Sequence, residues 1–134
     1  MLTLDLNWAA VLVAAAANVI IGFLWYSPPA FGTRWMELIG RRQEDLAAAG
    51  PYYALTIVCA LISSFVIATI IHAIGATTFA TGFQVGFLGW LGFTFPATMA
   101  DYLFAGRSSR LWLINNSYTL IVFLVMGMIL AGWR

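Results

Sequence analysis

Few residues of this sequence could do chemistry, and their spacing argues against catalysis. The chain has one histidine, His72, and one cysteine, Cys59, on a single predicted helix. An ordinary zinc site needs more ligands than these two residues supply. No serine or cysteine stands beside His72 as a nucleophile stands beside its base. We therefore expect no enzymatic activity, no metal and no cofactor.

Polar and aromatic residues gather at the ends of the long apolar segments. Asp101 is the only acidic residue within or at the edge of such a segment, and Asn115 and Asn116 begin the last one. Interfacial aromatic residues are common in membrane proteins, but a carboxylate and an amide pair need another explanation. The hypothetical ligand-binding site consists of Trp25, Tyr26, Asp101, Asn115, Asn116 and Tyr118.

Asp101 has two interpretations at this stage. Three arginines on its predicted side of the membrane are candidate partners, namely Arg34, Arg107 and Arg110. A salt bridge to one of them near the interface would be purely structural. Alternatively, the carboxylate could hold a cation or a proton.

The elements that must position these residues are four apolar segments, residues 7–27, 52–74, 79–101 and 111–133. Each reaches the roughly 20 residues that an α-helix needs to cross a bilayer. Only 8% of the chain is charged and 63% is hydrophobic, too few charges for a water-facing surface. We predict an all-α integral membrane protein, a four-transmembrane-helix bundle forming one domain over residues 1–134. A net charge of +1 without a clustered basic face excludes nucleic acid as a partner.

The arginines predict the orientation of the bundle. Five of them fall in the first and third connections, and only Arg134 falls on the opposite side. Lys and Arg concentrate in cytoplasmic loops, so both connections should be cytoplasmic and both termini outside. The five are Arg34, Arg41, Arg42, Arg107 and Arg110.

The first connection has the pattern of a short amphipathic helix. Its apolar positions recur at helical spacing and its charged residues take the other face. The apolar stripe is Phe31, Trp35, Leu38 and Ile39, opposite Arg34, Glu37, Arg41 and Arg42. Such a helix either lies in the headgroup region or packs on its own bundle. Residues 43–49 could extend it.

Four polar residues fall at a common depth near the middle of the predicted spans: Asn18, Ser63, Ser64 and Thr94. Amides and hydroxyls at such positions commonly hydrogen-bond between helices. We expect a structural polar layer in which Asn18 bonds Ser63 or Ser64.

The third span combines glycines with a proline. Gly82 and Gly86 form a GxxxG pair, which lets two helix backbones approach closely. Pro96 should kink this helix and free the carbonyl group of Gly92.

Several motifs resemble a known family. Leu24-Trp25-Tyr26-Ser27-Pro28, Phe31-Gly32 and Trp35 resemble the opening of the bacterial membrane family catalogued as domain of unknown function 1761. Its later signatures resemble Tyr102-Leu103-Phe104, Gly106-Arg107, Leu113-Ile114-Asn115, Tyr118 and Met126-Gly127. The resemblance implies a four-helix protein of the bacterial inner membrane, and assigns no activity.

The function that these observations favour is a small inner-membrane binding or accessory protein with a polar and aromatic site at the cytoplasmic leaflet. The alternative is a small homo-oligomeric transporter or channel subunit. A transporter needs polar residues across the full depth, and the external halves of the spans are almost purely apolar. The expected partners are membrane lipid and either a second copy or another membrane protein.

Overall fold

The computed structural model describes residues 4–41 and 50–133, and within these ranges it is helical with no strand. Helices are the expected solution for so apolar a chain, because a helix satisfies its backbone hydrogen bonds internally. The elements are α1 (Trp8–Trp25), α2 (Gly32–Ile39), α4 (Gly50–Ile74), α5 (Phe79–Gly89), the π-helix η1 (Trp90–Thr94), α6 (Phe95–Ala105) and α7 (Ser109–Gly132).

Three helices in the described part of the chain are long and apolar enough to cross a membrane. They are Trp8–Trp25, Pro51–Ile74 and Ser109–Gly132. Their ends follow local signals. The side chain of Asn7 caps the start of α1, that of Ser108 caps the start of α7, and α1 stops before the Pro28-Pro29 pair. The chain is therefore a membrane protein by its helices as well as by its composition.

The third predicted span is helical but not uniform. Helices α5, η1 and α6 follow one another without a gap, and η1 ends two residues before Pro96. The amide of Phe95 donates to the carbonyl oxygen of Trp90, five residues back. Proline cannot donate to the helix ladder, and a π-bulge is one way in which a helix accommodates such a break. The predicted irregularity at Pro96 is thus present, as a π-helix.

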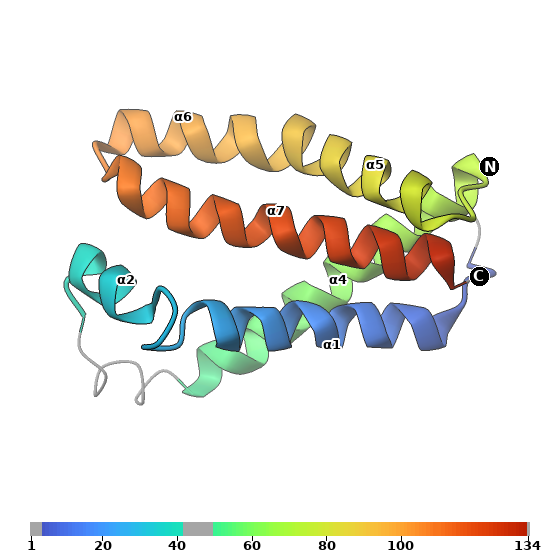
Figure 1. Cartoon of the computed structure of the whole chain (residues 1–134), viewed down its shortest axis with the longest axis horizontal. Coiled ribbons are helices and arrows are strands. Elements are labelled where there is room, and N and C mark those ends of the chain that lie inside the picture. Colours follow the sequence, from blue (N-terminus) through green and yellow to red (C-terminus); the bar gives the residue numbers. More distant parts are fainter. Residues whose placement is uncertain (1–3, 42–49, 134) are drawn as a thin grey trace.

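Helix α7 is the centre of the arrangement. It packs between α1 on one side and the run of α5, η1 and α6 on the other, while α4 crosses α1 at an angle (Figure 1). The buried apolar core is concentrated toward one end, where both chain ends lie (Figure 1). There, the side-chain amide of Asn7 donates to the carbonyl oxygen of Trp133 at 2.9 Å, which joins the start of α1 to the end of α7.

Glycines let α5 and α7 approach to backbone contact. A Cβ atom on Gly82 would overlap the carbonyl oxygen of Gly127, and one on Gly86 would overlap that of Phe123. The GxxxG pair therefore marks a close helix–helix contact, as the sequence predicted. Its partner on α7 is Gly127, for which a Cβ atom would in turn overlap the carbonyl oxygen of Gly82.

The predicted amphipathic helix in the first connection is confirmed as α2. Arg34 and Glu37 are exposed and form an ion pair at 3.1 Å, while Trp35 is half-buried. The ring of Trp35 packs on that of Tyr26, with centroids 4.9 Å apart. Of the two alternatives, this contact favours a helix packed on its own bundle. Residues 43–49 and Arg42 lie outside the described residues.

Candidate ligand pocket

A chain of hydrogen bonds joins α1, α7 and α6 near α2. The hydroxyl of Tyr26 donates to the side-chain oxygen of Asn115 at 2.8 Å. The amide nitrogen of Asn115 donates in turn to the hydroxyl oxygen of Tyr102, also at 2.8 Å. Asn115 thereby uses both ends of its amide to hold two tyrosines from different helices. The sequence placed these residues at one end of the bundle, and the structure brings them into contact.

Trp25 and Tyr118, two more of the predicted site residues, lie beside this chain of hydrogen bonds. The indole nitrogen of Trp25 donates to the carbonyl oxygen of Ile114 at 2.9 Å. The rings of Tyr26 and Tyr118 meet edge to face, with centroids 5.3 Å apart. Such aromatic contacts and hydrogen-bonded N–H groups restrict the orientations of the rings.

The predicted bond between Asn18 and Ser63 or Ser64 is wrong. The side-chain oxygen of Asn18 accepts from the hydroxyl of Tyr118 at 2.7 Å, so it joins α1 to α7 and not to α4. Its amide nitrogen faces the sulfur atom of Met126 at 3.9 Å, again on α7. The physical reason is that α1 lies against both helices, and Asn18 is on the face turned toward α7.

The other members of the predicted polar layer have separate environments. Ser64 is fully buried, and its hydroxyl donates to the carbonyl oxygen of Val11 at 2.7 Å. Ser63 is half-buried, and Thr94 lies in η1, where its carbonyl oxygen accepts from the hydroxyl of Thr98. Each is consistent with a structural role, but in the described residues the four do not bond one another.

Asn116 does not join Asn115, although the two are adjacent in sequence. It is buried, with 2% of its surface exposed, and its side-chain oxygen accepts from Thr98 at 2.8 Å. Its backbone oxygen accepts from the indole nitrogen of Trp90 at 3.1 Å, next to the π-helix. Adjacent helical residues point about 100° apart, so the pair divides between two faces of α7. Asn116 therefore connects α7 to η1 and α6 through hydrogen bonds.

Asp101 lies outside this group. Its carboxylate pairs with Arg107 at 3.4 Å, and both side chains are about half exposed. Arg107 also stands over the ring of Tyr102, 5.5 Å from its centroid. Of the two interpretations of Asp101, the structural salt bridge matches this geometry, and an exposed pair of this kind contributes at most about 1 kcal/mol.

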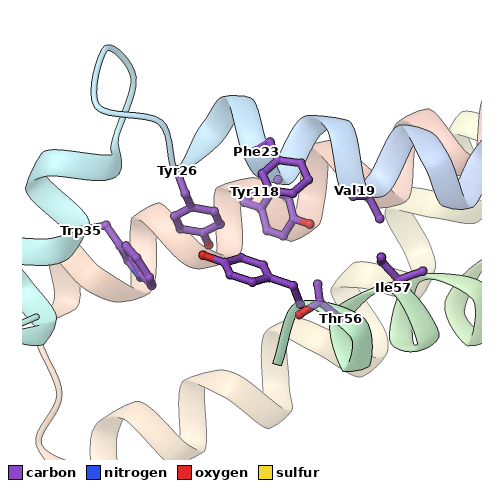
Figure 2. A pocket seen from close by; sticks show the side chains of 9 residues that line it. Val19, Phe23, Tyr26, Trp35, Thr56, Ile57 and Tyr118 are labelled. Carbon is purple, nitrogen blue, oxygen red and sulfur yellow. The ribbon is translucent and has the colours of Figure 1, made fainter. Parts of the chain in front are cut away.

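A cavity of about 300 Å³ opens beside Tyr26 and Tyr118 (Figure 2). Trp35 stands at one end, with Val19 and Ile57 toward the other (Figure 2). Four helices contribute to its walls, namely α1, α2, α4 and α7, together with Tyr26, which follows α1. They meet here because α4 crosses α1 at an angle (Figure 1). The lining residues are Val19, Gly22, Phe23, Tyr26, Trp35, Tyr53, Thr56, Ile57 and Tyr118.

The pocket offers apolar surface and hydroxyl groups, and none of its lining side chains is charged. The hydroxyls of Tyr26 and Tyr118 already donate to Asn115 and Asn18. The hydroxyl of Thr56 donates to the carbonyl oxygen of Tyr52. Among the described residues no cluster of His, Cys, Asp and Glu side chains could hold a metal ion. The arrangement can bind an uncharged molecule, and it contains no nucleophile paired with a base.

Sequence reasoning located only part of this pocket. Tyr26 and Tyr118 were among the predicted site residues, whereas Val19, Gly22 and Ile57 were not. These three are small or aliphatic residues within uniformly apolar segments, so nothing in their types marks them. One informative feature of the sequence was the spacing of Gly22 and Tyr26. Residues four apart lie on the same helix face, so the glycine leaves space one turn before the tyrosine ring.

The fold and the cavity together describe an all-helical chain with membrane-type apolar helices and an uncharged, aromatic-lined cavity near one end. The chain belongs to the family DUF1761, described as a protein of unknown function, whose model matches residues 9–131. Neither a curated protein nor a solved structure matches the chain.

Proposed function

We propose that this chain is a four-span protein of the bacterial inner membrane that binds a small ligand in the pocket between α1, α2, α4 and α7. In this proposal the protein is a binding or accessory protein and not an enzyme. The observation that carries the proposal is the pocket itself, because it is preformed by hydrogen-bonded tyrosines and has the size at which ligand pockets begin.

The fourth crossing in this proposal is the run of α5, η1 and α6. Neither α5 nor α6 is long enough by itself, but together with η1 they are continuous from Phe79 to Ala105. The run lies alongside α7 (Figure 1), in backbone contact at Gly82 and Gly86. A rise of about 1.5 Å per residue makes the whole run longer than the roughly 30 Å hydrocarbon layer.

Packing at the end where the chain termini lie disfavours the transporter alternative for a single chain. The space between α1, α4 and α7 there is filled by buried apolar side chains, including Val11, Ile71 and Met126. A path for a polar cargo would need polar groups through this region. The pocket is therefore proposed to serve binding from one leaflet only.

Orientation gives a first prediction. The first and third connections, which carry Arg34, Arg41 and Arg107, lie at one end of the bundle (Figure 1). The start of α1 and the end of α7 lie at the other end. The positive-inside rule then places the pocket end in the cytoplasmic leaflet. A periplasm-dependent reporter fused after Arg134 should be active. The same reporter inserted after Arg41 is the control and should be silent, and the reverse pattern would contradict the proposal.

Native mass spectrometry of protein extracted with its surrounding lipid tests the binding function. The parent chain should retain a bound non-protein mass after detergent or lipid is stripped. Ile57→Trp should lose that mass, because a large ring on α4 fills the cavity. Ile62→Trp is the matched control, since Ile62 is an exposed isoleucine of the same helix that does not line the pocket.

Loss of the bound mass from both variants, or from neither, would refute the pocket as the binding site. The same spectra report whether the chain is extracted as a single copy, with a second copy or with another membrane protein. Association is part of the proposal because α6 buries none of its own residues in the single chain, and Phe104 is 95% exposed.

A further inference from the structure

We infer that the ligand of this pocket is a neutral amphiphile, a single long alkyl chain that ends in an alcohol group. The inference rests on the proposed function and names the ligand class of that site. It follows from where the pocket opens, from the charges of its walls and from the hydrogen bonds of its hydroxyls.

The pocket opens on a surface that faces lipid. Phe23 on α1 and Ile57 on α4 line it and are 62% and 48% exposed. Both belong to helices that are long and apolar enough to cross a membrane. A ligand that enters between these helices comes from the hydrocarbon layer, where alkyl chains are the surrounding medium.

The walls exclude a charged ligand. An ion that leaves water for an apolar site needs a counter-charge or several hydrogen bonds. None of the nine lining residues is Asp, Glu, Lys, Arg or His. Arg34, the arginine adjacent to the lining residue Trp35, is exposed and paired with Glu37. Neither a carboxylate nor an ammonium group would find a counter-charge among the lining side chains.

The hydroxyls indicate an oxygen-bearing group on the ligand. Tyr26 and Tyr118 donate within the protein, so toward the pocket their oxygen atoms act as acceptors. Tyr53 also lines the pocket, and its hydroxyl group can donate a hydrogen bond to a ligand. An alcohol matches both, because it accepts from Tyr53 and donates to a second tyrosine.

Two lining residues constrain the size of the cavity. Gly22 is needed for the space, because a Cβ atom there would lie 3.0 Å from the hydroxyl oxygen of Tyr118. Trp35 bounds one end through its ring contact with Tyr26 (Figure 2). A volume of about 300 Å³ holds part of a lipid, so the remainder of the chain extends between α1 and α4 into the bilayer.

Thermal unfolding in lipid nanodiscs tests the ligand class with three probes that share one alkyl chain: oleyl alcohol, oleate and oleylamine. At equal mole fraction the alcohol should raise the unfolding midpoint of the parent by about 5 °C, because a bound ligand stabilises the folded state. The two charged probes should shift it by less than about 1 °C. Ile62→Trp should respond like the parent, and Ile57→Trp should not respond.

The variants test separately whether the ligand is neutral and whether it binds in this pocket. Tyr53→Phe should lose at least half of the shift, since it removes only the hydroxyl. If Ile57→Trp is unstable without ligand, Val19→Phe fills the same cavity from α1 and replaces it. A charged probe that stabilises the parent but not the filled variant would overturn the neutral ligand while leaving the pocket intact. Equal shifts in the parent and the filled variants, for every probe, would overturn both.

Discussion

Gly82→Ala should cause the largest loss of stability among single substitutions, about 3 kcal/mol in the free energy of unfolding. The added Cβ atom would overlap the carbonyl oxygen of Gly127 and lie 2.8 Å from the Cβ atom of Ala131. Backbone cannot move aside as a flexible side chain can, so α5 and α7 must separate along their contact. In lipid, close packing is a main source of helix association, and the separation therefore removes much of it. Chemical or thermal unfolding in detergent measures the loss.

Gly92→Ala is the matched control on the same helical run. A Cβ atom there meets no other atom within 4 Å, so the variant should be as stable as the parent or slightly more stable. The double variant Gly82→Ala with Gly127→Ala should lose less than the sum of the two single changes, because one separation relieves both overlaps. A Gly82→Ala protein as stable as Gly92→Ala would show that this backbone contact does not hold the helices together.

The second large effect is expected from Gly32→Ala. Its Cβ atom would overlap the carbonyl oxygen of Tyr26 and approach that of Ser27 to 2.7 Å. The first turn of α2 is held there by the amide of Gly32, which donates to the carbonyl oxygen of Ser27 at 2.9 Å. Displacing this turn should destabilise the docking of α2 by about 2 kcal/mol and withdraw Trp35 from Tyr26.

Limited proteolysis with trypsin measures that docking, since Arg34 and Arg41 are exposed on and beside α2. Cleavage follows the population of the open form, so the expected loss corresponds to cleavage more than tenfold faster. Thr33→Ala, at the next and exposed position, should be cleaved at the parental rate. Equal rates for the two variants would mean that α2 is not anchored through Gly32.

Tyr26 explains why α2 matters for the pocket. It follows the last residue of α1, its hydroxyl bonds Asn115 of α7, and its ring contacts both Trp35 of α2 and Tyr118 of α7. A shift of α2 should therefore also move Tyr26, which lines the cavity.

The sequence alone determined the helical segments, their approximate ends and the polar and aromatic character of the end that holds the pocket. Each depends on local properties. An apolar segment of about 20 residues becomes a helix in lipid because its backbone must bond internally. Capping residues, the Pro28-Pro29 pair and Pro96 act on neighbouring turns, and the helix ends and the π-turn lie beside them. The predicted orientation in the membrane likewise depends only on how many arginines each connection contains.

Only the tertiary structure decided which faces of the helices meet. The sequence could not pair Asn18 with Tyr118, or separate Asn115 from Asn116 across α7, or gather Val19, Gly22 and Ile57 around one cavity. In a water-soluble protein an apolar stripe marks the buried face of a helix. Here lipid and protein interior are equally apolar, so hydropathy does not distinguish the two faces. Rotation is set instead by close contacts such as Gly82 on Gly127, and these fix the polar partners and the pocket.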